Sequence, residues 1–189
     1  MTLRRGFPAD AERMALALRQ ELGLDPADPL PLEDAARTRH VQVVSAAQLI
    51  DVERLAELER IQAFAFSACT FEISGRSVIV FNPLRSEPRR KSDVAHELSH
   101  MLLEHDLTEI RSVAGVPFRT CRGDQEEEAT TLGGTLLLPR PLLLRAIAHG
   151  QGVEEIAREC GVTIEMARFR VNTTGVVRQT ARAKARRVQ

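Results

Sequence analysis

Two histidines and a glutamate in the middle of the chain have the spacing of a metal-binding helix. His96, Glu97 and His100 form the pattern H-E-x-x-H, and the apolar residues around them predict a helix over residues 93–104. Residues four apart on a helix lie about 40° apart in rotation and one turn apart in height, so both imidazoles can reach one metal ion. Glu97 can then act as general base on a zinc-bound water and later protonate a leaving amine. The pattern predicts a zinc hydrolase, and the alternative is a surface helix with two solvated histidines.

A catalytic zinc ion needs a third protein ligand besides the two histidines. One known pattern continues with a glycine and a third histidine, but this chain has Leu103 and Asp106 at those positions. That class of zinc peptidase is therefore excluded. The remaining source of a ligand is a carboxylate on a later helix.

Three consecutive glutamates follow Asp124 at the start of the next predicted helix. At about 100° per residue, Glu126 borders the apolar face of that helix, whereas Glu127 and Glu128 point away from it. Glu127 is also the capping-box partner of Asp124. We therefore predict Glu126 as the third ligand, and we interpret the other two as acidic residues that favour a helix N-terminus.

These residues resemble a known family of zinc metallopeptidases. The run from His96 to His100, followed by Glu126-x-x-Ala129 and the residues Leu-Leu-Leu-Pro at 136–139, is similar to the ImmA/IrrE family. The resemblance covers roughly residues 30–175. Two further segments share it, the basic residues 89–95 and the segment 156–171.

The resemblance implies a gluzincin-like site in which His96, His100 and Glu126 bind zinc and Glu97 is catalytic. Members of the family are bacterial or phage-associated and cleave helix-turn-helix repressors, which releases genes of mobile elements or of stress and DNA-damage responses. We therefore expect a zinc metalloendopeptidase with such a repressor as its protein substrate. The chain departs from the family where Asn, Phe and Ala are replaced by Thr130, Leu132 and Gly133.

The elements that must position these residues are mostly helical. We expect an α+β, zincin-like (gluzincin-type) fold with a small antiparallel sheet and a C-terminal helix-turn-helix-like piece. Alternation over residues 64–73 and the β-rich run at 78–81 predict a hairpin, and we expect an extended substrate to lie along its second strand. Gly133 and Gly134 should let the two ligand helices approach closely. Other predicted elements are helices at 14–22, 51–61, 124–138, 141–149, 153–160 and 163–171, a helix that starts within 29–34, a strand at 41–44, and loops around Pro83 and Pro88 and up to Gly123.

Composition indicates a globular protein without a membrane span. The chain has 189 residues, 43% hydrophobic and 28% charged, and its formal net charge is zero. These values exclude a disordered or fibrous chain and give no overall attraction to nucleic acid or membrane. Because no signal sequence opens the chain and its three cysteines are widely spaced, we expect a cytoplasmic location. We predict a stand-alone protease core with a zincin-like domain at 1–150, a helical subdomain at 151–177 and a flexible basic tail at 178–189.

A second class of function is a DNA-binding or repressor-sequestering regulator without peptidase activity. Arg168 and Arg170 in the last predicted helix, followed by the arginine-rich tail, could contact DNA phosphates. A basic tail on a neutral protein is more simply a solvated one. We therefore do not expect nucleic acid or a membrane as a direct partner.

The oxyanion of peptide hydrolysis needs a further hydrogen-bond donor. The sequence contains no tyrosine, so the candidates are His40, His105, His149 or an arginine. His105 more simply suits the C-terminus of the H-E-x-x-H helix, where a histidine is favourable. Cys121, shortly before Glu126, suggests a further hypothesis in which its thiolate binds the zinc and silences the enzyme.

Overall fold

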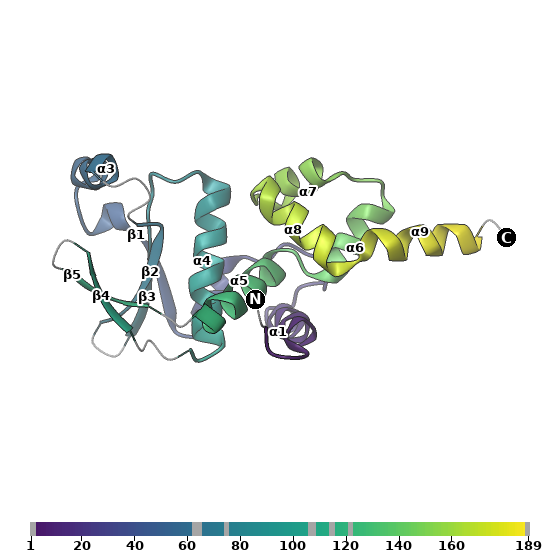
Figure 1. Ribbon diagram of the computed structural model, residues 1–189, viewed down its shortest axis with the longest axis horizontal. Helices are drawn as coiled ribbons and strands as arrows, with labels where there is room; N and C mark the ends of the chain where they lie inside the picture. The colour runs from purple at the N-terminus through teal and green to yellow at the C-terminus, as the bar shows by residue number, and fades with distance from the viewer. Residues whose placement is uncertain are drawn as a thin grey trace.

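Helices α4 (Glu87–Leu102) and α5 (Gly123–Leu137) pack against each other at the centre of the fold, between a small sheet and the C-terminal helices (Figure 1). The computed structural model describes residues 3–61, 66–73, 76–105, 109–113, 116–120 and 123–187. The fold is α+β and mostly helical, as the sequence predicts. None of the described helices is both long and apolar enough to cross a lipid bilayer. The other elements are α1 (Phe7–Glu21), α2 (Leu32–Arg37), β1 (Val41–Ser45), η1 (Ala46–Gln48), α3 (Val52–Ile61), β2 (Ala68–Ile73), β3 (Arg76–Phe81), β4 (Glu109–Val113), β5 (Val116–Thr120), α6 (Arg140–Ala148), α7 (Val153–Cys160), α8 (Ile164–Thr174) and α9 (Val176–Arg187).

The main sheet is mixed rather than wholly antiparallel. Among the described residues its strand order is β1-β3-β2, with β2 antiparallel and β1 parallel to β3. The pairing of β2 with β3 confirms the predicted hairpin. The predicted small antiparallel sheet is present as the β2–β3 pair, and β1 adds a parallel strand to it. Strand β1 connects to this pair through η1 and α3, a crossover of the kind that parallel strands need.

Strand β3 lies in the middle of this sheet, so the prediction that a substrate lies along it is wrong. Val78, for example, is paired with Gln42 of β1 on one side and with Phe71 of β2 on the other. The apolar run of β3 is the pattern of a strand buried between neighbours, and Ile79 is fully buried. Among the described residues, β2 is paired on one side only, so it forms an edge of the sheet.

Two stretches that the sequence predicts as loops have regular structure. Helix α4 begins at Glu87, well before the predicted start at residue 93, and Pro88 lies in its first turn. A proline is tolerated there because its missing N–H has no intrahelical partner in any case. Strands β4 and β5, which lie between α4 and α5 in the sequence, form an antiparallel pair where a loop is predicted because the polarity is mixed.

Two adjacent glycines fit α5 against two different helices. A Cβ atom at Gly133 would lie 3.2 Å from backbone atoms of Ala95 and His96 in α4, which confirms that this glycine allows the ligand helices to approach closely. A Cβ at Gly134 would instead lie 3.0 Å from Sδ of Met166 and 3.1 Å from Cδ of Arg170, both in α8. The expectation that Gly134 serves the same contact as Gly133 is therefore wrong.

The predicted helix-turn-helix-like piece consists of α7 and α8. Gly161 ends α7 in the left-handed conformation (φ 61°), and the Thr163 hydroxyl caps α8 by accepting a hydrogen bond from the Met166 N–H. The segment that the sequence predicts as a flexible tail is helical up to Arg187, where alanine, arginine and glutamine favour a helix. The division into a domain at 1–150 and a subdomain at 151–177 stays a prediction.

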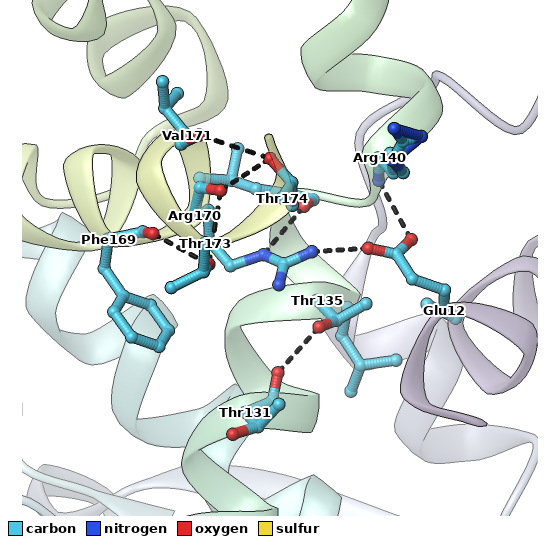
Figure 2. Close-up of polar contacts among 12 residues, drawn as sticks. Glu12, Thr131, Thr135, Arg140, Phe169, Arg170, Val171, Thr173 and Thr174 are labelled. Carbon is cyan, nitrogen blue, oxygen red and sulfur yellow. Dashed lines mark hydrogen bonds and ion pairs between the residues drawn. The ribbon is translucent and has the colours of Figure 1, made fainter. Parts of the chain in front are cut away.

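A buried ion pair joins α8 to the N-terminal helix (Figure 2). Nη2 of Arg170 lies 2.6 Å from Oε1 of Glu12, and its Nε donates to the Leu138 carbonyl at 3.1 Å. The second oxygen of Glu12 accepts a hydrogen bond from the backbone N–H of Arg140 at 2.9 Å. Because Arg170 is only 5% exposed, its guanidinium is not available for the DNA contact considered above.

Candidate metal centre

Helices α4 and α5 bring two imidazoles and a carboxylate together. His96 and His100 lie one turn apart on α4, with their Nε2 atoms 3.1 Å apart. From α5, Oε2 of Glu126 lies 3.1 Å from Nε2 of His96, and Oε1 lies 3.6 Å from Nε2 of His100. One donor atom from each residue lies within 4.8 Å of the others. The three residues that the sequence predicts as metal ligands are thus gathered in one cluster.

This donor set fits a zinc ion. Zinc takes imidazole nitrogens and carboxylate oxygens at about 2.0–2.2 Å in tetrahedral geometry, which places neighbouring donors about 3.3 Å apart. The separations of 3.1, 3.1 and 3.6 Å lie on both sides of that value. Three protein donors leave a fourth position open, as catalytic zinc sites require.

The two histidines keep Glu126 ionised. Hydrogen bonds from His100 and from His96 hold the pKa of the Glu126 carboxyl well below its usual range, although partial burial opposes this. A carboxylate binds metal in its deprotonated form. The cluster therefore presents its oxygen ligand in the form that a cation needs.

Glu97 is held in place by a residue of the sheet. The hydroxyl of Thr70, on the edge strand β2, donates a hydrogen bond to Oε2 of Glu97 at 2.8 Å. Burial raises the pKa of the Glu97 carboxyl, while the Thr70 hydrogen bond and the nearby imidazoles act in the opposite direction. A raised pKa makes the carboxylate a stronger base, which suits a group that must accept a proton near neutral pH.

Helix α4 ends in a turn that folds the chain back toward His100. Glu104 has a φ of 51°, a left-handed conformation that residues other than glycine seldom adopt. Its N–H donates to the Met101 carbonyl at 3.2 Å, and the N–H of His105 donates to the His100 carbonyl at 3.1 Å. These two bonds form a Schellman turn, which places His105 next to the second histidine of the motif.

His105 connects His100 to a carboxylate on α5. Nδ1 of His105 lies 2.9 Å from Nδ1 of His100, and its Nε2 lies 3.3 Å from Oε2 of Glu128. Arg4 in turn lies 3.5 Å from Oε1 of Glu128. The His105 side chain is only 6% exposed, so water competes little for these contacts. We call this set the His105 relay.

The His105 relay has a defined direction of hydrogen bonding when a metal is bound. If Nε2 of His100 held a metal, its Nδ1 would carry the proton and would donate a hydrogen bond to Nδ1 of His105. His105 would then carry its own proton on Nε2 and would donate a hydrogen bond to Glu128. Such a chain fixes the tautomer and the orientation of a ligating histidine.

The residues that support the three candidate ligands are not apparent from the sequence. Thr70 and Glu128 have this role through contacts between separate elements, which no local pattern records. The hydroxyl oxygen of Thr130 lies 3.4 Å from Nδ1 of His96. Thr130 also stands where the resembled family has Asn, and that departure was the available signal.

The remaining histidines considered as oxyanion donors have other surroundings. His105 has the structural role at the helix end that the sequence favours, as part of the relay. His149 follows α6, where its Nδ1 lies 2.7 Å from the Arg145 carbonyl, and His40 lies in the turn before β1. Cys121 lies outside the described residues.

The α+β fold, with two imidazoles and a carboxylate on packed helices beside a small sheet, is that of a zincin-like domain. The chain belongs to the Peptidase M78 family, whose model, described as an IrrE N-terminal-like domain, matches residues 52–172. This match confirms the resemblance to the ImmA/IrrE family.

A solved structure gives a similar fold. A Mycobacterium tuberculosis transcriptional regulator matches with a TM-score of 0.54 and 20% sequence identity, over 89% of this chain and 47% of that chain. The present chain therefore spans about half the length of that regulator. None of the curated proteins matches the chain.

Proposed function

We propose that the protein is a zinc-dependent endopeptidase that cleaves a helix-turn-helix transcriptional repressor. The observation that carries this proposal is the convergence of His96, His100 and Glu126, with Glu97 beside them, in a chain of a metallopeptidase family. The similar structure is called a transcriptional regulator, which supports a link to gene control. Because such a substrate acts on DNA, we place the protein in the bacterial cytoplasm. Cleavage of the repressor would derepress mobile-element or stress-response genes.

The proposed chemistry is hydrolysis of a peptide bond. His96, His100 and Glu126 would hold a zinc ion, which would polarise the scissile carbonyl and lower the pKa of a bound water. Glu97 accepts a proton from the attacking water and later donates it to the leaving amine. The Thr70 hydroxyl holds Oε2 of Glu97, and the other carboxylate oxygen would take this proton.

The edge of β2 is the proposed binding place for an extended substrate. Among the described residues β2 is unpaired on one side, and Thr70 in this strand contacts Glu97. A peptide that adds to this edge gains main-chain hydrogen bonds, as in other cases of strand addition. It would then run beside the proposed general base.

Replacing His105 by Phe is expected to weaken zinc binding by about 10–100-fold, the usual cost of losing a partner that orients a metal ligand. The change keeps a ring of similar size but removes both hydrogen bonds of the relay. Competition between the protein and a zinc-chelating dye measures the affinity. His149→Phe, the same change at the exposed end of α6, is the matched control and should keep the parent's affinity. Equal affinities in parent and His105→Phe would refute the positioning role.

The experiment that tests the function is the bound metal per chain, measured by elemental analysis. We expect about one zinc in the parent protein and its loss in His100→Ala and in Glu126→Gln, because each change removes one of three protein ligands. Glu127→Gln makes the same chemical change one residue further along α5 and should retain zinc. A parent without zinc, even after zinc is supplied, would refute the proposal. If Glu126→Gln retained zinc, the third ligand would have to be reassigned to Glu127 or Glu128.

A further inference from the structure

Helix α9 carries a concentrated positive charge. Its 12 residues include five basic residues and no acidic one. Because the whole chain is formally neutral, the remaining residues together carry a net charge of −5. A separation of charge of this kind attracts a polyanion to one part of an otherwise neutral protein.

Four arginines line a single hollow beside α9. Arg178, Arg182 and Arg186 follow one another at intervals of four residues and form a stripe along the helix, and Arg140 at the start of α6 lines the same space. The hollow has a volume of about 590 Å³, and the described residues that line it include no acidic one. The Arg140 guanidinium donates a hydrogen bond to the Gln179 side chain, which joins α6 to α9 at this point. We call this feature the arginine hollow.

We propose that the arginine hollow binds the phosphate backbone of duplex DNA. Four residues of a helix rise about 6 Å, so the stripe from Arg178 to Arg186 spans about 12 Å. This is the axial length of about three to four phosphates on one DNA strand. The planar guanidinium fork matches phosphate oxygens better than an ammonium group does, and the four cationic side chains that the described residues contribute to the hollow are arginines. The exposed side chains of Arg178, Arg182 and Arg186 are free to approach such a backbone.

The composition of α9 favours DNA over a membrane surface. A helix that lies in a membrane interface combines basic residues with large apolar ones that enter the acyl region. After Val177, the apolar residues of α9 are alanines alone. The helix therefore offers charge without an apolar anchor.

The arginine hollow is separate from the metal centre. Helix α9 extends away from α4 to the end of the molecule opposite the sheet (Figure 1). No residue of the hollow belongs to the candidate zinc cluster. The DNA contact therefore does not depend on the proposed peptidase function. Together, the two sites would hold a peptidase next to a repressor that is bound to DNA.

The sequence predicts a solvated tail that binds no nucleic acid, whereas the helical structure of this segment favours a DNA contact. A flexible tail scatters its charges, whereas a helix aligns every fourth residue on one side. Arg140 lies far from the tail in the sequence and adds to the stripe only through the packing of α6 against α9.

The test measures how a fluorescent mixed-sequence DNA duplex binds to the full chain. Fluorescence anisotropy gives the affinity over a range of salt concentrations. Four phosphate contacts predict a slope of log K against log salt of about −3.6, a loss of about 150-fold in affinity between about 50 and 200 mM salt. Arg178→Glu with Arg182→Glu should flatten this slope by about 2 and weaken binding. Arg186→Gln alone, a milder change, should flatten it by about 1.

The matched control is Arg54→Glu with Arg60→Glu, two exposed arginines of α3 that change the net charge equally. This pair should bind the duplex with the parent's salt dependence. Thermal melting of both double variants checks that each is folded. Absence of salt-dependent duplex binding by the parent, or an equal loss in the two double variants, would overturn the proposal. Binding to phosphatidylserine vesicles without binding to the duplex would overturn it as well.

Discussion

Replacing Glu97 by Gln is expected to lower the rate of peptide hydrolysis by about 10²–10⁴-fold while bound zinc stays in place. The Glu97 carboxylate lies beside the candidate metal ligands, and the Thr70 hydroxyl holds one of its oxygens at 2.8 Å. Glutamine preserves the shape of the side chain but cannot accept the proton of the attacking water. The rate is measured by mass spectrometry of a mixture of synthetic peptides, and zinc by elemental analysis of the same samples.

Glu127→Gln is the matched control, because it removes an acidic group near the site without touching the proposed base. It should keep both the activity and the zinc of the parent. A Glu97→Gln variant that holds zinc and hydrolyses peptides at the parent's rate would show that Glu97 is not the base. A variant that loses its zinc would point to a ligand role for Glu97 instead.

Replacing Glu12 by Ala is expected to lower the free energy of unfolding by about 3–5 kcal/mol. The change leaves the guanidinium of Arg170 buried without its carboxylate partner, and it also removes the acceptor of the Arg140 N–H (Figure 2). An unpaired buried charge costs more than the lost attraction alone, because the charge remains out of water. Urea unfolding followed by circular dichroism measures the effect.

Asp10→Ala serves as the control, since Asp10 lies on the same helix and its ion pairs with Arg4 and Arg13 are on the surface. Exposed pairs contribute only about 0–1 kcal/mol, so this variant should unfold close to the parent. Glu12→Leu combined with Arg170→Met removes both buried charges and should recover part of the stability that Glu12→Ala loses. If Glu12→Ala were as stable as Asp10→Ala, the buried pair would not hold α8 to α1.

The sequence was informative about the candidate ligands because their spacing is a helical property. His96 and His100 are four residues apart, and residues at this interval lie on the same side of any α-helix, whatever surrounds it. The apolar face of the next helix then singled out Glu126 from three adjacent glutamates, and the structure places this residue beside the two histidines. The β2–β3 hairpin followed from alternation in the same way.

The order of strands in the sheet is a feature that such local patterns do not predict. The apolar run of β3 predicts a strand, but the same run fits an edge strand as well as a central strand of a sheet. Only the pairing of β1 with β3, through a crossover, decides that β3 lies inside and that β2 forms an edge. The start of α4 was misplaced for a related reason, since Pro88 interrupts a helical pattern in the sequence and is tolerated in the first turn of the actual helix.

By itself, the sequence determined the residues that can do the chemistry, because helix and hairpin patterns repeat over a few neighbouring residues. Tertiary structure alone decided what surrounds them. Thr70 reaches Glu97, His105 reaches Glu128, and Glu12 reaches Arg170 across 158 positions. Such contacts depend on how separate elements cross and pack, and side-chain periodicity along one element contains no record of that geometry.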